Sequence, residues 1–142
     1  AIAIIPGLFE EFLFRGIIQK NFYLISRNHH LAIWLSAFIF SAIHMQFYGF
    51  FPRLLMGVLF GYLFYWSGSI FYAVIAHTFN NFFAVTMWYA AQQGYFGKEY
   101  ELGVNDPPDL PVVVIILSLI LFLITIYFVR QKLLNERADK MG

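Results

Sequence analysis

The chain has 142 residues, of which 61% are hydrophobic and 12% are charged, with nine basic and eight acidic side chains. Soluble domains carry about twice this fraction of charge, so the composition excludes an ordinary soluble protein and indicates a membrane protein surrounded by the lipid bilayer. We expect no nucleic-acid partner. The absence of cysteine excludes disulfides and thiolate metal sites.

Five apolar segments, each expected to be a helix, follow one another along the chain. Pro52 is suited to the first turn of a helix and Ser69 to an N-cap. Gly57 and Gly61 form a GxxxG motif, which we expect to allow close packing within the bundle. The sequence therefore predicts an all-α, polytopic transmembrane helical bundle with about five membrane segments, at residues 3–23, 31–51, 52–66, 69–92 and 112–129.

Alternating the five segments across a bilayer separates the charges. One side receives six basic residues, whereas the other receives Arg53, Lys98 and the acidic residues of a polar loop. By the positive-inside rule we expect the basic side, which includes a charged tail at residues 130–142, to be cytoplasmic. Residues 1–129 form the predicted helical core. Because the chain begins at Ala1 directly in apolar sequence, we interpret it as a fragment or processed form that lacks earlier membrane spans.

Two adjacent carboxylates, Glu10 and Glu11, are the only acidic residues among the first 97, and both lie in an apolar segment. An ionised carboxylate is costly there unless it is paired or put to use. Measured from the basic side at about 1.5 Å per helical residue, four polar groups fall at similar depths of about 14 to 21 Å: Glu10, His44, His77 and Asn81. The hydrocarbon core is about 30 Å thick, so the sequence predicts one shared polar site near its middle.

Spacing within each segment separates the roles of these side chains. Glu11 and Arg15 are four residues apart and share a helix face, so we interpret them as a structural ion pair. Glu10 is rotated by about 100° from Glu11 and has no basic partner at helical spacing, which leaves it free to act as a base. Phe40, one turn before His44, is placed to wall off the surroundings of that histidine.

Three motifs occur in order on separate predicted helices. Residues 10–15 fit EExxxR, residues 40–44 fit FxxxH, and residues 77–81 fit HxxxN. Together these motifs resemble the CAAX protease and bacteriocin-processing family, the intramembrane endopeptidases also called the Abi or type II CAAX prenyl protease group. The resemblance covers residues 10–81, and the later loop and fifth segment carry no diagnostic feature.

The resemblance implies a mechanism and a substrate class. Glu10 and His44 would activate a water molecule for attack on a peptide carbonyl, while His77 and Asn81 would donate hydrogen bonds to the oxyanion. The implied partner is a peptide or a membrane-anchored protein segment near its C-terminus, and its prenylation is left open. We expect no cofactor and no bound metal, and an integral protein of the bacterial cytoplasmic membrane.

Several alternatives remain open. Glu10, His44 and His77 could form a three-ligand zinc site with an open position for water, as in a zinc-dependent intramembrane metalloprotease, although the chain lacks HExxH. A protein of the same fold could act without catalysis, as a membrane regulator or a bacteriocin-immunity protein. Buried glutamate and histidine could also serve a proton-coupled transporter, which the lack of repeat symmetry disfavours. Asn80 could replace Asn81 if the helix were locally rotated.

Overall fold

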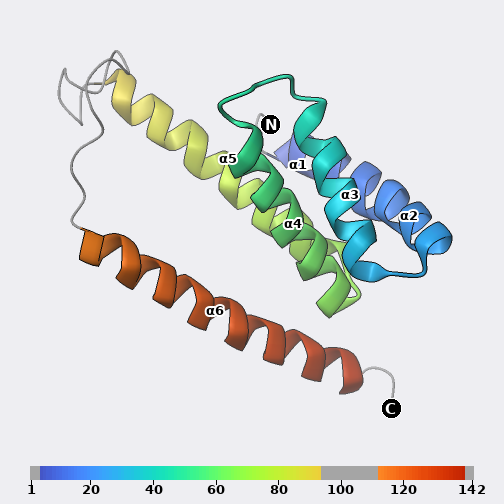
Figure 1. Cartoon of the computed structure of the whole chain (residues 1–142). Helices are drawn as coiled ribbons and strands as arrows, with labels where there is room; N and C mark the ends of the chain where they lie inside the picture. The colour runs from blue at the N-terminus through green and yellow to red at the C-terminus, as the bar shows by residue number, and fades with distance from the viewer. Residues whose placement is uncertain (1–3, 94–111, 140–142) are drawn as a thin grey trace.

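The computed structural model describes residues 4–93 and 112–139, with only the backbone described for residues 112–115. This part of the chain contains helices and no β-strand, which confirms the all-α prediction for the residues described. Figure 1 shows α3 and α4 side by side, with the long helices α5 and α6 running past them. In chain order the elements are α1 (Ile4–Glu11), η1 (Phe12–Ile18), α2 (Gln19–Ser26), α3 (His29–Ala42), α4 (Phe50–Ser67), α5 (Ile70–Gln92) and α6 (Val112–Asp139).

The first three elements form one continuous helical rod, but the middle of that rod, η1, is a π-helix. At its end the backbone N–H of Gln19 donates to the carbonyl of Phe14, five residues earlier, where an α-helix would use the residue four earlier. Such π-turns are rare and occur frequently at functional sites. Because η1 begins directly after Glu11 and contains Arg15, the EExxxR motif lies across the junction between the two helix types.

The connection between α2 and α3 is short and capped. Arg27 adopts a left-handed φ of 57°, which ends α2. The side chain of Asn28 then accepts hydrogen bonds from the backbone N–H groups of His30 and Leu31, satisfying the first turn of α3. This helix therefore begins at His29, slightly before the predicted start at Leu31.

The second predicted segment, residues 31–51, is not one helix, because a turn follows residue 42. α3 ends at Ala42 and α4 begins at Phe50. Within the turn, Met45 adopts a left-handed φ of 53°, which a helix cannot accommodate. Ser41 holds the turn in place by donating from Oγ to the carbonyl of Phe50 at 2.6 Å. His44 consequently lies in this turn and not within a helix, which corrects the expectation that three membrane helices supply the site.

The GxxxG motif brings α4 close to two other elements. A Cβ added at Gly57 would lie 3.1 Å from Cβ of Ala37 on α3, and one at Gly61 would lie 2.8 Å from Cγ2 of Ile33. Gln19 of the rod donates to the carbonyl of Gly61 at 3.3 Å. The motif therefore allows the close packing within the bundle that was predicted for it.

We expect the Gly61→Ala variant to be destabilised by about 1–3 kcal/mol, because its methyl group would collide with Ile33 and with Gln19 Oε1, at 2.9 Å. A lowered melting temperature in detergent measures this effect. Gly16→Ala is the matched control: its Cβ would meet only Ile70 Cδ1, at 3.8 Å, and alanine favours a helix, so its stability should be unchanged or higher. Wild-type stability in Gly61→Ala would show that this contact does not constrain α4.

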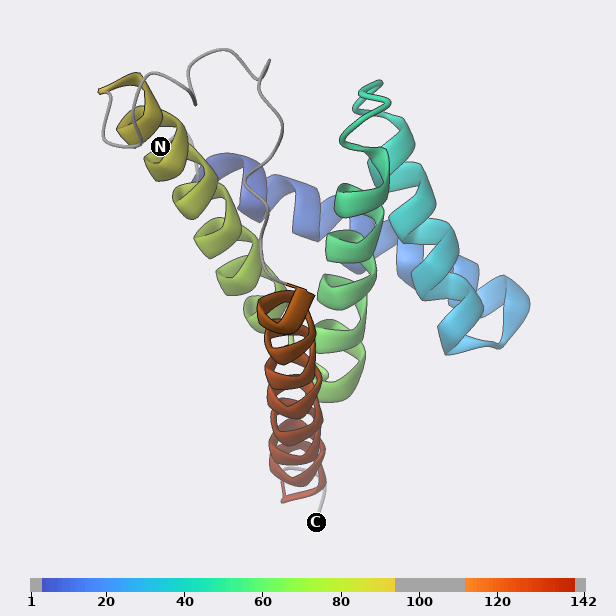
Figure 2. The same cartoon turned by 60° about the vertical axis from the view of Figure 1, so that its left-hand side comes forward.

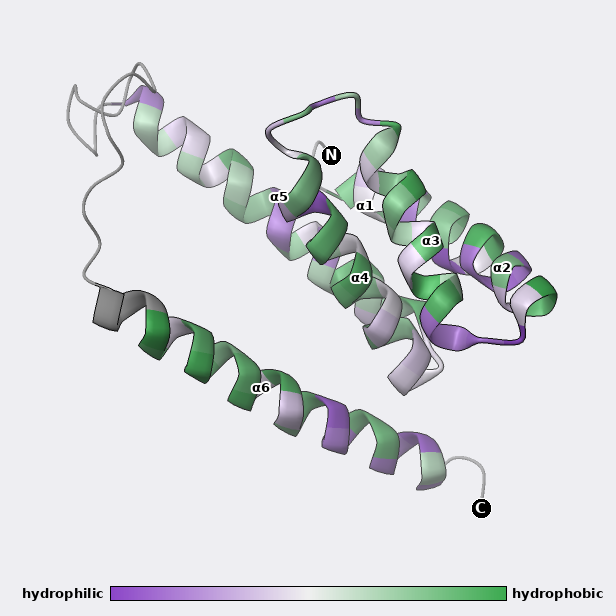
Figure 3. Cartoon of the chain, viewed as in Figure 1, coloured by the Kyte–Doolittle hydropathy of each residue, from purple (hydrophilic) through white to green (hydrophobic). Residues whose placement is uncertain are grey.

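The C-terminal helix, α6, is longer than predicted. It continues to Asp139, past its expected end at Val129, so the predicted boundary between core and tail falls inside one helix. Leu133 is buried, and Arg137 donates to the carbonyl of Tyr65 at 2.6 Å, which docks this end of α6 on the end of α4. Figure 2 shows α6 passing the lower end of α4, and Figure 3 shows polar residues gathered along the C-terminal half of α6.

Two of the described helices are long and apolar enough to cross a membrane, Ile70–Gln92 and Ile116–Asp139. Only 17% and 6% of their most apolar windows are buried inside the protein, unlike the core helix of a soluble protein. Their apolar side chains therefore point away from the rest of the chain, as expected of helices that face lipid. The predicted total of about five membrane segments stays a prediction.

Candidate active site

The centre of the bundle holds a buried ion pair between Glu11 and Arg15. Arg15 Nη1 donates to Glu11 Oε1 at 2.7 Å, and Nη2 donates to the carbonyl of Gly57 at 2.7 Å. The guanidinium carbon also lies 5.3 Å and 5.5 Å from the ring centres of Phe40 and Phe60, within cation–π range. The predicted ion pair is therefore present. Because both charges are removed from water, neither can lose its partner without a large cost.

His77 of α5 connects this ion pair to the second carboxylate. Its Nδ1 lies 2.7 Å from Glu11 Oε1, and its Nε2 lies 3.6 Å from Glu10 Oε2. An ionised carboxylate only accepts hydrogen bonds, so Nδ1 carries a proton and Nε2 faces Glu10. The imidazole is buried and stacks on Phe60, with 4.9 Å between ring centres. Glu11 thus fixes the orientation of His77 as well as pairing with Arg15, a contact that the sequence analysis did not predict.

The two neighbouring glutamates differ in their surroundings. The side chain of Glu10 is 30% exposed, whereas that of Glu11 is 0% exposed. In the part of the chain that the structure describes, His77 is the one basic side chain within salt-bridge distance of Glu10. Glu10 therefore keeps an accessible carboxylate, and Glu11 belongs to the interior. This difference agrees with the prediction that the two cannot play the same part.

His44 lies in the turn after α3, and a backbone carbonyl of that helix orients its ring. Its Nδ1 lies 2.7 Å from the carbonyl of Phe40, and because a carbonyl only accepts, Nδ1 is the protonated nitrogen. In the neutral ring, Nε2 then carries the lone pair and is available to accept a proton. The ring of Phe40 contacts His44 edge-on at 5.1 Å and also approaches His77 at 5.8 Å. Phe40 therefore contacts both imidazoles.

A pocket of about 450 Å³ brings the four predicted catalytic residues together. Glu10 comes from α1, His44 from the turn, and His77 and Asn81 from α5, whereas Glu11 and Arg15 lie buried outside the lining. Its complete lining consists of Glu10, Phe40, His44, Gly49, Pro52, Arg53, Met56, Phe60, His77, Asn80 and Asn81.

Comparison with protein families matches residues 1–83 to the family described as type II CAAX prenyl endopeptidase Rce1-like. The match covers more than half of the chain and contains all three motifs. The chain belongs to the Rce1-like family. The comparisons with curated proteins and with solved structures gave no match. The resemblance inferred from the EExxxR, FxxxH and HxxxN motifs is thereby confirmed.

Membership of the Rce1-like family places the chain in a family of membrane-embedded proteases. The two long apolar helices agree with a membrane location. Every predicted site residue, from Glu10 to Asn81, lies within the matched part, whereas α6 lies beyond it. The roles of the individual side chains stay predictions, including the choice between Asn80 and Asn81, which both line the pocket.

Sequence reasoning missed one charged residue of this Rce1-like pocket, Arg53. Its Nη2 donates to Gln46 Oε1 at 2.6 Å, and its Nη1 is buried without a hydrogen-bond partner. The charge count placed Arg53 on the less basic side of the membrane and gave it no role. A signal was present, since Arg53 is the one lysine or arginine between Arg27 and Lys98, in a largely apolar stretch.

Within residues 4–93 and 112–139, no group of three or more His, Asp or Glu side chains is arranged to hold a metal ion. Both histidines direct Nδ1 to an acceptor, Glu11 or the carbonyl of Phe40, which leaves both Nε2 atoms free of these bonds. The alternative zinc site of Glu10, His44 and His77 therefore depends on how closely the two Nε2 atoms and Glu10 can approach one ion. Chelation tests that alternative directly.

Proposed function

We propose that the protein is an intramembrane endopeptidase that hydrolyses a peptide bond with water activated by Glu10 and His44. The observation that supports this proposal most is the shared pocket, in which Glu10, His44, His77 and Asn81 line one volume of about 450 Å³. Membership of a protease family supports the same reaction class.

The proposed reaction uses Glu10 as general base and then as general acid. A water molecule between Glu10 and Nε2 of His44 gives a proton to the Glu10 carboxylate while its oxygen bonds to the peptide carbonyl carbon. The carbonyl oxygen takes up the negative charge of the tetrahedral intermediate. When the C–N bond breaks, protonated Glu10 returns the proton to the leaving nitrogen. One water is consumed, and the products are a carboxylic acid and an amine, which become a carboxylate and an ammonium group when the second proton of the water passes to the amine.

We assign the oxyanion site to Nε2 of His77 and the side-chain amide of Asn81. Because the Nδ1 proton of His77 is directed at Glu11, Nε2 can donate only when the ring carries a second proton. The buried Glu11 carboxylate offsets the positive charge of that ring, and Arg15 holds Glu11 in place. Glu11 and Arg15 therefore act as positioning residues, whose effect on the reaction passes through His77.

Asn81→Ala is expected to lower kcat by about 10²–10³-fold with little change in KM, because an oxyanion donor acts mainly in the transition state. Peptide cleavage by the purified protein in liposomes measures both constants. Asn80→Ala is the matched control, since it removes the same group from the neighbouring position in the same pocket. We expect this control to stay within a few-fold of wild type. The opposite order of effects would assign the donor to Asn80.

The proposed substrate is a peptide or membrane-anchored segment near its C-terminus. The direct test incubates the protein in liposomes with a farnesylated C-terminal peptide and with its unmodified counterpart, and identifies products by mass spectrometry. Cleavage of either peptide supports an endopeptidase, and the ratio of rates decides whether prenylation matters. Binding of both peptides by folded protein without cleavage would contradict the proposal and favour the non-catalytic regulator.

We further place the protein in the bacterial cytoplasmic membrane, with its C-terminal end in the cytoplasm. The distribution of basic residues supports this orientation, because Lys20, Arg130 and Arg137 belong to the basic side of the segment arrangement. A reporter that is active only in the cytoplasm, fused to the C-terminus, tests it. An inactive reporter on an expressed and folded fusion would reverse the orientation.

A further inference from the structure

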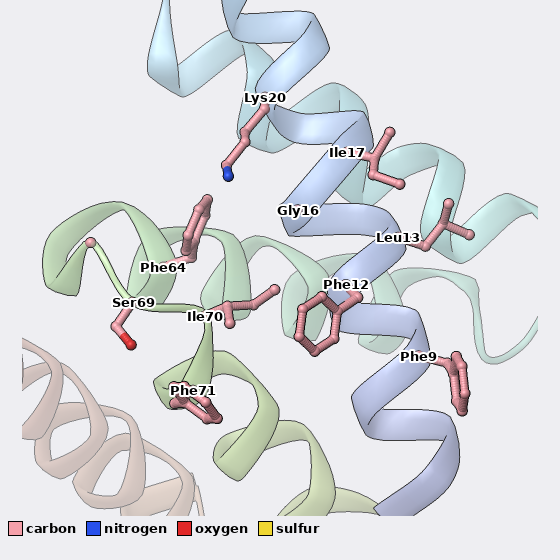
Figure 4. Close-up of a pocket in the computed structure, with 11 residues that line it drawn as sticks. Phe9, Phe12, Leu13, Gly16, Ile17, Lys20, Phe64, Ser69, Ile70 and Phe71 are labelled. Atoms are coloured by element: carbon pink, nitrogen blue, oxygen red, sulfur yellow. The ribbon is translucent and has the colours of Figure 1, made fainter.

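An apolar groove of about 680 Å³ lies along the rod beside the turn between α4 and α5. None of the residues that line it lines the candidate active site. Figure 4 shows Phe12 of η1 and Ile70 of α5 facing one another across it, with Lys20 close to the ring of Phe64 at one end. The groove has the size of a small-molecule site, and its lining is mostly aromatic and aliphatic.

A smaller pocket of about 250 Å³ adjoins the cationic end of this groove and shares Lys20, Phe64 and Gly68 with it. The smaller pocket adds two more basic side chains, His29 at the start of α3 and Arg137 on α6. Lys20, His29 and Arg137 therefore converge from three elements, the consecutive helices α2 and α3 and the helix α6, which is distant from them in the sequence.

The positive charge of this pocket has no counter-charge among the residues described. No acidic side chain lines either the groove or the pocket. Lys20 Nζ lies 5.8 Å from the ring centre of Phe64, and Arg137 donates to a carbonyl, that of Tyr65. Burial and the positive charges of Arg137 and His30 lower the pKa of His29. An anion in the smaller pocket would offset the charges of Lys20 and Arg137, and it would favour the protonated form of His29.

The structure thus joins an apolar groove to a cationic pocket, and we propose that together they bind one anionic phospholipid. One acyl chain occupies the groove between Phe12 and Ile70, and the phosphate lies among Lys20, His29 and Arg137. Basic pockets between membrane helices bind anionic headgroups by this combination of charge and apolar contact. Because Lys20 belongs to α2 and Arg137 to α6, the bound lipid ties the last helix to the rod.

The test uses the purified full chain in a neutral detergent, titrated with phosphatidylglycerol, phosphatidylcholine or inorganic phosphate. Native mass spectrometry counts bound lipid, and thermal unfolding reports its effect on the fold. We expect phosphatidylglycerol to bind more tightly than phosphatidylcholine and to raise the melting temperature more, and millimolar phosphate to have no effect. Equal binding of the two lipids, or an equal effect of phosphate alone, would overturn the proposal.

Charge-removing variants locate the site. Lys20→Gln and Arg137→Gln should each weaken phosphatidylglycerol binding about five-fold, the effect of one headgroup cation. Arg130→Gln is the matched control, because it removes an exposed charge from the same helix as Arg137 outside both pockets. Arg137→Gln also removes the hydrogen bond that docks α6 on the carbonyl of Tyr65. Lys20→Gln removes a charge from the pocket and leaves that hydrogen bond in place.

Three outcomes of the variant series would reject the lipid site. An equal loss of binding in Arg130→Gln would show non-specific attraction of anionic lipid to a basic surface. Unchanged binding in Lys20→Gln would remove the groove's cationic end from the site. Displacement of phosphatidylglycerol by an equal concentration of farnesylated peptide would assign the groove to a peptide substrate. The proposal is supported if Arg130→Gln binds phosphatidylglycerol as the wild type does and the other two variants bind it more weakly. It also requires that farnesylated peptide does not displace the lipid.

Discussion

Glu10→Gln is expected to lower kcat for peptide cleavage by about 10²–10⁴-fold, because glutamine keeps the shape of the side chain but cannot take a proton from water. His44→Ala should reduce kcat in the same direction, since it removes the second group that holds the water. The melting temperature of Glu10→Gln should change little, because the Glu10 side chain is 30% exposed and outside the Glu11–Arg15 ion pair. Cleavage under saturating substrate, measured beside an unfolding curve, separates the two effects.

Two matched controls accompany this prediction. Glu136→Gln removes a carboxylate that contacts Tyr72 and Lys132 outside the pocket, and His30→Ala removes an imidazole bonded to the Tyr62 hydroxyl. Both should retain the wild-type rate within a few-fold. Cleavage by Glu10→Gln at the wild-type rate would exclude Glu10 as the base. Complete inhibition by a chelator, reversed by zinc, would replace the proposed base with metal-bound water.

Glu11→Gln is expected to have the largest effect on stability, a loss of about 3–5 kcal/mol in the free energy of unfolding. The variant leaves the Arg15 guanidinium buried with the carbonyl of Gly57 and two aromatic rings as neighbours, but without its paired carboxylate. It should also lower kcat, since a neutral glutamine no longer offsets the positive charge of a doubly protonated His77 ring. Thermal or chemical unfolding in detergent, together with cleavage at a temperature where the variant is folded, measures both losses.

The double variant Glu11→Gln/Arg15→Met distinguishes the two roles of Glu11. Removing both charges of a buried pair is much less costly than removing one, so we expect a large part of the stability to return. The cleavage rate should stay low, because His77 still lacks its carboxylate partner. Recovery of stability and activity together would mean that Glu11 serves the reaction only by balancing Arg15.

The residues of the candidate site could be found from the sequence because charge is rare and costly in apolar segments. Glu10, Glu11 and Arg15 stand out for this reason, and the helical spacing of Glu11 and Arg15 predicted their ion pair correctly. His77 and Asn81 were assigned to one helix in the same way, and α5 contains both. The helical class followed from the same apolar runs.

The turn that carries His44 could not be predicted from periodicity. Residues 31–51 form an almost uninterrupted apolar run, and in a membrane protein such a run gives no contrast between a buried face and an exposed one. The end of α3 depends on the left-handed conformation of Met45 and on the hydrogen bond from Ser41 to Phe50, and neither leaves a pattern in the sequence. The position of His44 just beyond the helix therefore required the tertiary structure.

The contact between Glu11 and His77 was missed for a different reason. It joins residues of α1 and α5 that are distant in the chain, and helical spacing reports only on partners within one element. The π-helix was also missed, because η1 is apolar apart from Arg15 and Gly16, so its sequence gives no contrast that would distinguish an i+5 pattern from an i+4 pattern.

The π-turn of η1 places one more residue in the rod than an unbroken α-helix would hold over the same length. The extra residue lies between the two glutamates of α1 and the side chains of Gln19 and Lys20 on α2. Deleting one residue other than Arg15 between Phe12 and Ile18 would therefore close the turn into an ordinary α-helix, and the residues on both sides would keep their faces of the rod. Gln19 would still reach the carbonyl of Gly61, whereas the same deletion within the regular helix of α1 would rotate every later residue by about 100°.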